Sequence, residues 1–531
     1  MALTELLGSF PLVSSGMPKF QVAAIYLAIG LVSWYILSSI SAWYRLKAFP
    51  GPPTTGFSNL WAARAIWTGK AHQIFPATQE RYGPLTRIGH NALMVCDAAT
   101  VVHINGVRGG YARSKDFYDC IRMDPWDHTV LSESDSAMHN ERKTKVYAGY
   151  HGKGEMDMEK DVDMVVAQAV ELIRAKYMNS AATSGHGSKP PLDYTRIARH
   201  IAVDSVTQTG FGKAWGDVRE EKDHFGWLGF ADMIVGYLHS LAYVPAISKI
   251  VVSKPLMVLL GPKPTDKTGM GAFLGLIERE VAKRFKDGEA KGTPLKADTG
   301  RSSMLDEWVK NGISQRTAVL EVSAQLPAGS DTTASALQGT MLYLLSTPSA
   351  YVRLKSEITT AIRDGRISSF PVTDQEARKL PYLQAVLHEG IRMMPPLMNG
   401  FPRQVPPEGD TICGHFVPGG TAIIVNYVGM LRDKQVFGED ADVFRPERYL
   451  DGTDEEKRHR MLKVTDLAFS HGRWRCLGQR LAWLQLQKVV VEFIRNFDMQ
   501  IVDPMHPCRL RGYCTPEMDD LMVRVAEAKL D

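Results

Sequence analysis

The segment FSHGRWRCLG, residues 469–478, decides the fold of this 531-residue chain. It places Cys476 directly before a helix-like run, residues 479–493. A thiolate at a helix N-terminus is stabilised by the macrodipole and by free backbone N–H groups. Such a thiolate is the proximal ligand of a haem iron that must push electron density towards bound oxygen. The alternative for a single cysteine is a structural role, so its neighbours in the sequence are decisive.

The residues around Cys476 resemble a known motif. Phe469, Gly472, Cys476 and Gly478 stand at the offsets of the haem-binding loop of the cytochrome P450 family, and the segment is similar to that loop. With average residue usage, about one chain in a thousand would match by chance. The resemblance implies that Cys476 is the iron ligand of haem b and that Phe469 belongs to the cofactor site.

Three further motifs occur at the places that this resemblance requires. Glu389 and Arg392 are three residues apart and share one face of an expected helix, residues 382–393. An exposed pair is the plain interpretation. Arg448, in Phe444-Arg445-Pro446-Glu447-Arg448, matches the third member of the family's buried Glu-Arg-Arg network. Buried charges persist only when they are mutually paired, so we expect structural supports here and not catalysts.

The second motif, Ala328-Gly329-Ser330-Asp331-Thr332-Thr333, lies inside the longest helical run, residues 315–346. Glycine in a helix interior costs about 1 kcal/mol relative to alanine, so Gly329 needs a reason, and close approach of a flat cofactor supplies one. The resemblance assigns Thr332 to iron-bound dioxygen and Asp331 to proton delivery. A solvent-facing polar patch fits poorly, because both flanks are largely apolar.

The third motif concerns the haem propionates. His139 and Lys143 lie one helical turn apart, and Arg403 follows the Pro395-Pro396 break. The resemblance gives all three residues a propionate-binding role, although a basic residue on a helix is more often only solvated. The chain departs from the family pattern at Trp474, which stands where the family has an arginine. Which group then meets the propionate is left open by the sequence.

The N-terminus predicts a membrane anchor. Residues 1–20 form a short lead, and residues 21–44 form an apolar helix long enough to span a bilayer. A cleaved signal peptide is the alternative, but the amino end lacks a basic cluster and the apolar run is long. Residues 45–56 form a Pro-rich linker, and residues 57–531 the haem-thiolate monooxygenase domain. Basic Arg45 and Lys47 predict a single-pass protein of the endoplasmic reticulum with a cytosolic domain.

The composition is ordinary for a globular protein. Hydrophobic residues make up 44% of the chain, and the net charge of +4 is too small to indicate nucleic-acid binding. Six cysteines in so long a chain do not form a disulfide framework. The expected fold is mainly α with small β-sheets, the cytochrome P450 fold, preceded by one transmembrane helix. Strands are expected at 85–88, 92–95, 400–403, 411–416 and 421–427, and surface loops at 180–191 and 287–303.

The resemblance implies a monooxygenase that inserts one oxygen atom of O2 into a lipophilic small molecule. Electrons would come from NADPH through a separate NADPH–cytochrome P450 reductase, because no flavin or dinucleotide fingerprint is present. The cysteine loop is similar to that of filamentous-fungal members such as the pisatin demethylase-like group, which indicates secondary metabolism. A basic docking face for the reductase could be formed by Lys457, Arg458, Arg460, Lys463, Arg473, Arg475 and Arg480. A merely solvated charged surface explains Lys457 to Lys463 equally well.

Two other functions stay open from the sequence. One is an enzyme of the same fold that rearranges or dehydrates an oxygenated substrate without O2, which the presence of Asp331 and Thr332 disfavours. The other is a non-catalytic haem-binding protein. Dependence of turnover on NADPH separates the first of these from a monooxygenase.

Overall fold

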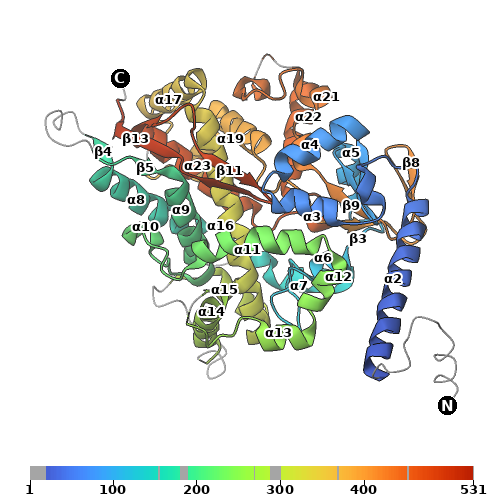
Figure 1. The fold of residues 1–531 in the computed structure, drawn as a ribbon. Helices are drawn as coiled ribbons and strands as arrows, with labels where there is room; N and C mark the ends of the chain where they lie inside the picture. Colours follow the sequence, from blue (N-terminus) through green and yellow to red (C-terminus); the bar gives the residue numbers. More distant parts are fainter. Residues whose placement is uncertain are drawn as a thin grey trace.

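The computed structural model describes residues 19–529 apart from 153–155, 180–188, 268, 287–300, 368–369, 451 and 453. Helices dominate the described part of the chain (Figure 1). They are α2 (Lys19–Arg45), α3 (Leu60–Trp67), α4 (Ala71–Tyr82), α5 (Ala98–Asn105), α6 (Lys115–Tyr118), α7 (Ser136–Tyr150), α8 (Met158–Lys176), α9 (Tyr194–Phe211), α10 (Asp217–Glu220), α11 (Trp227–Ala242), α12 (Pro245–Val251), α13 (Lys254–Leu260), α14 (Gly269–Lys286), α15 (Met304–Lys310), α16 (Gln315–Leu345), α17 (Pro348–Arg363), α18 (Asp374–Arg378), α19 (Pro381–Met393), α20 (Tyr427–Met430), α21 (Lys434–Phe437), α22 (Glu455–Asp466) and α23 (Gln479–Asn496).

The strands form small sheets at the edge of this helical body. The largest sheet has five strands in the order β1-β2-β9-β6-β3, and a second has the order β10-β13-β4, with β5 also pairing with β13. Two hairpins, β7–β8 and β11–β12, complete the set. The strands are β1 (Leu85–Gly89), β2 (Ala92–Val95), β3 (Ala112–Arg113), β4 (Met178–Asn179), β5 (Leu192–Asp193), β6 (Arg403–Gln404), β7 (Asp410–Ile412), β8 (His415–Val417), β9 (Ala422–Val425), β10 (Phe497–Ile501), β11 (Arg509–Gly512), β12 (Pro516–Asp519) and β13 (Met522–Glu527).

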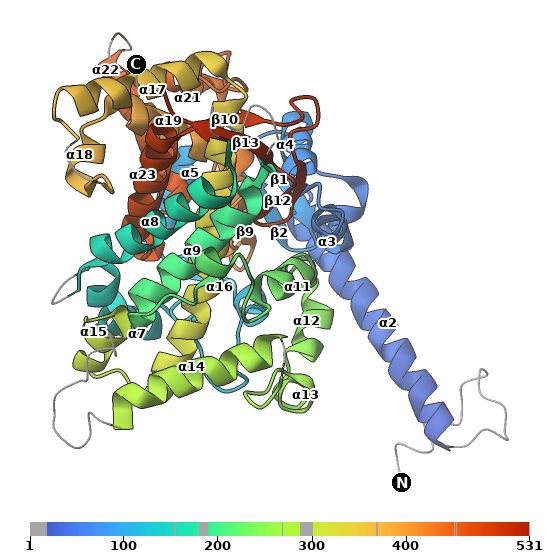
Figure 2. The same cartoon turned by 90° about the vertical axis from the view of Figure 1, so that its left-hand side faces the viewer.

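Helix α16 runs through the middle of the molecule (Figures 1 and 2). Ser314 caps its first turn by accepting a hydrogen bond from Thr317 N–H, and Pro327 does not interrupt it. Apolar residues on almost every side of the helix are buried against neighbouring helices, among them α9 and α19. A helix that is apolar all round belongs in the interior, so the residues of the second motif are carried deep into the protein.

The Glu-Arg-Arg network forms as expected. Arg392 donates through Nε to Glu389 Oε2 at 2.7 Å and through Nη2 to Oε1 at 2.8 Å, and Arg448 Nε donates to Oε1 at 3.0 Å. All three side chains are almost completely buried. Arg392 also donates to the carbonyl of Leu431, and Arg448 to that of Phe437. The network therefore fixes the irregular chain that precedes the cysteine loop.

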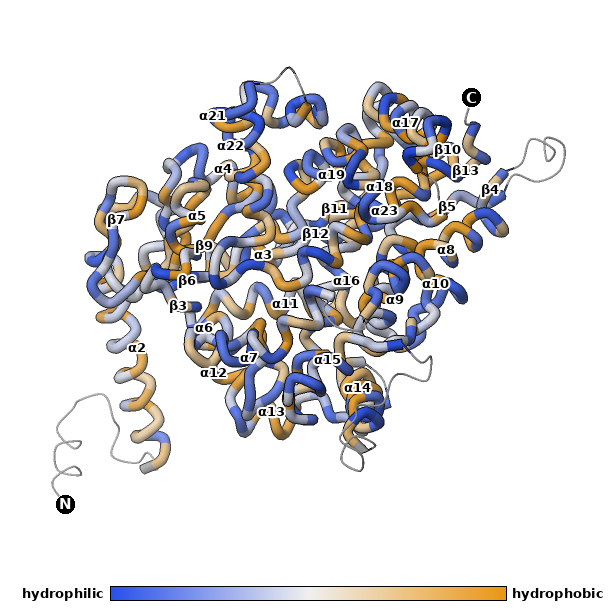
Figure 3. The backbone as a smooth tube through the Cα atoms, turned by 180° about the vertical axis from the view of Figure 1, so that it is seen from behind, coloured by the Kyte–Doolittle hydropathy of each residue, from blue (hydrophilic) through white to orange (hydrophobic). Residues whose placement is uncertain are grey.

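Helix α2 is the one helix of the described residues that is long and apolar enough to cross a membrane. It projects away from the body (Figure 2), and the hydropathy colouring of the backbone in Figure 3 is mostly hydrophobic along it. Its last turns contact the domain: Tyr35 and Ser39 donate to the Phe57 carbonyl, and Arg87 of β1 donates to the carbonyls of Ala42 and Trp43. A candidate anchor is thus joined to the catalytic body by several hydrogen bonds.

The segment expected to be a linker packs against the same strand. Arg87 N–H donates to the Pro50 carbonyl at 2.8 Å, and Leu46 and Phe49 are buried. Residues 1–18 of the expected lead lie outside the described residues. The division into lead, anchor, linker and domain stays a prediction.

The mainly helical fold with small sheets is confirmed, with two local corrections. Residues 411–416 were expected as one strand, but β7 and β8 form a hairpin that turns at Cys413 and Gly414, both with positive φ. In 400–403 only Arg403 joins a strand, because β3 ends opposite it at Arg113 and Pro402 has no N–H for the ladder. Most of the two expected surface loops, 180–191 and 287–303, lies outside the described residues.

Candidate functional site

The cysteine loop is built from two short 3-10 turns, η4 (Leu467–Phe469) and η5 (Gly472–Trp474), followed by α23. Cys476 N–H donates to the Phe469 carbonyl at 2.8 Å, which closes the loop. Gly472 has φ +56°, and a Cβ there would stand 2.4 Å from the Asn105 carbonyl oxygen. Only glycine is compatible with that conformation and that approach. The glycine thus lets the loop pass against the end of α5.

The expected favourable electrostatic interactions around Cys476 are present, but burial has the larger effect on the pKa of its thiol. Burial raises the pKa of the thiol, while the backbone N–H groups of Gly478 and Gln479 and the positive charges of Lys143 and Arg475 act to lower it. The helix N-terminus therefore faces the sulfur, as the sequence predicts. Coordination of a metal ion would deprotonate the thiol outright.

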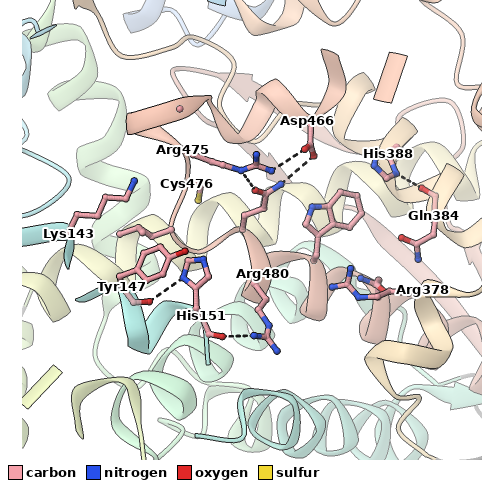
Figure 4. A pocket seen from close by; sticks show the side chains of 15 residues that line it. Lys143, Tyr147, His151, Arg378, Gln384, His388, Asp466, Arg475, Cys476 and Arg480 are labelled. Atoms are coloured by element: carbon pink, nitrogen blue, oxygen red, sulfur yellow. Dashed lines mark hydrogen bonds and ion pairs between the residues drawn. The ribbon is translucent and has the colours of Figure 1, made fainter. Parts of the chain in front are cut away.

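Cys476 opens onto a recess of about 630 Å³ (Figure 4). Helix α7 supplies Lys143, α18 supplies Arg378, and α23 supplies Arg480 to its wall. Arg475 also lines it and donates to Asp466 at 3.1 Å, the one carboxylate among the lining residues. The recess is consequently a strongly basic surface beside the sulfur.

The expected propionate ligands converge on Trp474. This side chain is buried, and its ring centroid lies 4.5 Å from that of His139 and 5.1 Å from the Arg403 guanidinium carbon. A further guanidinium, that of Arg113 on β3, lies 4.3 Å from the same ring. Burial, together with the charge of Arg113, lowers the pKa of His139 to about 3, so that imidazole is neutral.

Arg113 is the residue that the sequence analysis missed. It is buried, donates through Nη1 to the carbonyls of Val130 and Glu133, and leaves Nε without a hydrogen bond. Of the arginines that flank Trp474, Arg473 has its guanidinium carbon 5.8 Å from the Trp474 ring and donates to the Val107 carbonyl, and Arg475 donates to Asp466. No signal in the sequence singles out Arg113, because strand pairing of β3 with β6 brings it beside Arg403.

Lys143 lies at the edge of this cluster. Its Nζ donates to the Arg473 carbonyl at 2.8 Å, and burial lowers the pKa of the amine. The expected pair of His139 and Lys143 therefore divides, with His139 under Trp474 and Lys143 on the recess wall.

The residues of the second motif lie on a stretch of α16 that is less buried than its flanks. Ala328 is exposed and Asp331 and Thr332 are partly exposed, whereas 320–326 and 333–341 are buried. Thr332 Oγ1 donates to the Ala328 carbonyl at 2.7 Å. Burial, moderated by Arg199, raises the pKa of Asp331 to about 6. Neither Asp331 nor Thr332 lines the recess that contains Cys476.

Gly329 has a different structural reason from the one expected. A Cβ on Gly329 would stand 2.8 Å from Val206 Cγ2 on α9. Its lack of a side chain thus allows α9 and α16 to pack closely, and its approach to a cofactor stays a prediction.

These groups fit the donor set that haem requires. Cys476 offers a thiol for the iron, and the middle of α16, around Ala328, is less buried than its flanks. Arg113 and Arg403 are buried, yet among the described residues neither forms an ion pair with a carboxylate. Buried guanidiniums normally have anionic partners, and the two carboxylates at the edge of haem would supply them.

Comparisons with known proteins agree with this geometry. The family model described as cytochrome P450 matches residues 50–512. "Cytochrome P450 monooxygenase ABA1" of Pyricularia oryzae is 36% identical over 513 residues, covering 96% of each chain. "Cytochrome P450 monooxygenase aba1" of Botryotinia fuckeliana is 34% identical and covers 91% of this chain and 92% of its own. "Cytochrome P450 monooxygenase abl1" of Leptosphaeria maculans is 34% identical, with 91% and 83% covered.

Proposed function

This chain belongs to the cytochrome P450 family and is a monooxygenase, and on that premise we propose that it oxidises a lipophilic small molecule of fungal secondary metabolism. The observation that carries the proposal is the exposed Cys476 in one loop with Trp474, against which the buried guanidiniums of Arg113 and Arg403 pack. Among the described residues, neither guanidinium forms an ion pair with a carboxylate. The three relatives named above align with more than nine tenths of this chain. Each is named a cytochrome P450 monooxygenase and comes from a fungus. The proposed substrate classes are terpenoids, polyketides and alkaloid intermediates.

Each proposed site residue has one task. Cys476 Sγ ligates the iron of haem b, with Phe469 and Gly329 beside the cofactor. Arg113, Arg403, His139 and Lys143 hold the propionate edge. Bound haem supplies the redox chemistry that activates O2, placing one oxygen atom in the substrate while the other leaves as water.

The protein's own contribution to that chemistry is the handling of protons. Thr332 donates its hydroxyl hydrogen bond to the Ala328 carbonyl. The lone pairs of Oγ1 are therefore free to accept a further hydrogen bond. Asp331, with a pKa near 6, holds or releases a proton close to neutral pH. A group with such a pKa suits general acid catalysis at pH 7.

The electron donor and the cellular location follow from surface features. We infer that NADPH–cytochrome P450 reductase docks over the basic recess, because its cations face the outside next to Cys476. Helix α2 would hold the protein in the endoplasmic reticulum membrane, with Arg45 and Lys47 on the cytosolic side.

The test is the absorbance difference spectrum of the dithionite-reduced protein with carbon monoxide. We expect a strongly red-shifted Soret band in the wild type and in Cys514→Ala, a control at a buried cysteine. The band should be absent from Cys476→Ala. A folded wild type without a haem band would contradict the proposal, and turnover that needs neither NADPH nor O2 would contradict the monooxygenase reaction.

A further inference from the structure

A second ionisable cluster surrounds Asp331 on the side of α9 and α11. A small cavity of about 30 Å³ lies there, lined by Asp331 of α16, Arg199 of α9, Asp232 of α11 and Glu517 of β12. A space of this size accommodates one or two water molecules, at about 15 Å³ each. Asp519 of β12 lines it as well, so four elements that are distant in the sequence bring four carboxyls and one guanidinium around a single space.

Arg199 and Asp232 form a two-pronged ion pair across the cavity. Nη1 of Arg199 donates to Oδ2 of Asp232 at 3.0 Å, and Nη2 lies 2.7 Å from Oδ1. Nη2 also donates to the Leu228 carbonyl. Because a paired fork of this kind is geometrically fixed, the guanidinium cannot turn fully towards either of the other two carboxyls.

Glu517 is the least satisfied member of the cluster. Its side chain is 13% exposed, and neither carboxyl oxygen has a hydrogen bond. Arg511 Nε lies 3.5 Å from Oε2, but that arginine also binds Asp519 at 2.9 Å and is 45% exposed. A buried carboxyl without hydrogen bonds is strongly disfavoured as an anion.

The charges around the cavity favour bound protons. Four carboxyls, those of Asp232, Asp331, Glu517 and Asp519, face two guanidiniums, Arg199 and Arg511. Burial raises the pKa of Glu517 to about 7 and that of Asp331 to about 6, and Asp232 acts in the same direction on both. Two neighbouring acids therefore change protonation close to neutral pH.

A hydrogen bond between α16 and β12 fixes the relative positions of the two acids. Ser335 Oγ, one turn after Asp331, donates to the Pro516 carbonyl at 3.0 Å and to the Asp331 carbonyl at 2.7 Å. Glu517 follows Pro516 directly, so β12 is fixed to α16 at the level of Asp331. The partly exposed Arg511 and Asp519 connect the outer side of Glu517 with solvent.

We propose that Glu517 is the group through which Asp331 exchanges protons with solvent, and that the Arg199–Asp232 pair positions the two carboxyls across the cavity. The proposal rests on the role proposed for Asp331. The proton leaves the Glu517 carboxyl, crosses through cavity water to the Asp331 carboxylate, and is replaced from solvent beside Arg511. Each turnover takes up two protons with two electrons from the reductase, so the relay consumes nothing else. Glu517 affects the reaction only through Asp331, and it is therefore a positioning residue and not a catalytic residue.

The first test is infrared titration of carboxyl groups in the purified holoprotein between pH 5 and 9, without substrate. We expect the protonated-carboxyl band to lose one component with a midpoint near 7 in Glu517→Gln. In Asp331→Asn that component should titrate at lower pH, because the Asp331 charge raises the pKa of Glu517. Glu527→Gln, an exposed glutamate at the end of β13, should match the wild type. A Glu517 component that titrates near pH 4 would overturn the proposal.

The second test measures how much of the NADPH consumed with the reductase, with no organic substrate added, is released as hydrogen peroxide. In the wild type that fraction should rise as pH passes 7 and Glu517 loses its proton. In Glu517→Gln it should be high and independent of pH, with water formation about tenfold lower at pH 6, the lower part of the range for a lost proton donor. Glu517→Asp should restore the pH dependence.

An unchanged pH profile in Glu517→Gln would overturn the relay. A wild type with the thiolate spectrum that consumes no NADPH would instead count against the proposed function, while the infrared result would still decide on the cluster.

Discussion

Arg113 and Arg403 bring two positive charges into the interior beside Trp474. Removing an ion from water costs several kcal/mol even after the protein relaxes, and hydrogen bonds to carbonyls offset only part of that cost. The charges are tolerable if an anion completes the site. At the scale of single residues, these two side chains are therefore the strongest indication of where the carboxylate edge of haem would lie.

Replacing Arg113 by leucine tests this interpretation. We expect the purified Arg113→Leu protein to bind haem at least tenfold more weakly, because one charge-assisted contact is worth about 1.5–3 kcal/mol. The measurement is the haem-to-protein ratio on dilution. Arg475→Leu, in the cysteine loop but paired with Asp466 at the surface, is the matched control and should retain haem. Equal retention by both variants would count against a role for Arg113.

Glu321 is a buried acid of α16 with a pH-dependent effect on stability. It is 4% exposed and accepts a hydrogen bond from Val130 N–H at 2.8 Å, and burial raises its pKa from 4.5 to about 8. Because the folded-state pKa lies above the unfolded one, folding favours the protonated acid. Its contribution to stability is complete below pH 4.5 and is lost as the pH rises to about 8.

Glu321→Gln keeps an acceptor for Val130 but has no charge to bury. We expect wild-type stability to fall more steeply than that of the variant between pH 5 and 8, by up to about 1.4 kcal/mol per pH unit. Urea unfolding of the holoprotein at several pH values measures the difference. Glu278→Gln, on the exposed side of α14, should follow the wild-type curve; parallel curves for Glu321→Gln would refute the assignment.

At the scale of elements, the contact between α9 and α16 sets the position of the second motif. Val206 fills the space above Gly329, and a β-branched side chain has little rotameric freedom in a helix. We predict that Gly329→Ala lowers stability by about 1–3 kcal/mol through overpacking, despite alanine's better helix propensity.

The partner substitution separates packing from cofactor contact. If the clash with Val206 is the cause, the double variant Gly329→Ala, Val206→Ala should recover most of the stability lost by the single variant. Gly229→Ala on α11, where a Cβ meets open space, is the control and should be neutral or stabilising. Thermal unfolding measures these three variants, Val206→Ala alone and the wild type. A double variant as unstable as the sum of its parts would rule out the packing explanation.

At the scale of the whole molecule, the basic recess and the candidate anchor are the two features proposed to meet the reductase and the membrane. The recess gathers cations from three helices on the face beside Cys476, whereas α2 leaves the body by itself (Figures 2 and 4). Exposed charges of this kind accelerate association more than they strengthen it, and salt screens them.

We therefore expect Arg475→Glu to reduce reductase-driven turnover about tenfold at low salt and to leave peroxide-driven turnover unchanged. The comparison of the two rates over a range of ionic strengths is the measurement. Arg524→Glu, an exposed arginine of β13 that does not line the recess, should behave as the wild type. Equal loss in both assays would mean that Arg475 supports the haem loop and not docking.

The sequence by itself determined the fold class, the cysteine loop, the Glu-Arg-Arg network and the apolar N-terminal helix. Their main parts are encoded locally: Cys476 directly precedes α23, Glu389 and Arg392 are one helical turn apart, and the candidate anchor is a continuous apolar run. Arg448, the third member of the network, was assigned by resemblance to the family. Spacing along the chain translates directly into geometry when one helix or one loop carries the whole pattern.

Only the tertiary structure decided the rest. Arg113 lies beside Trp474 because β3 pairs with β6, and Glu517 shares a cavity with Asp331 because β12 packs on α16. Gly329 has Val206 as its neighbour because two helices cross there. A lone arginine, glutamate or glycine has no sequence context that announces such partners, since the partners come from elements far away along the chain and meet only when the chain packs.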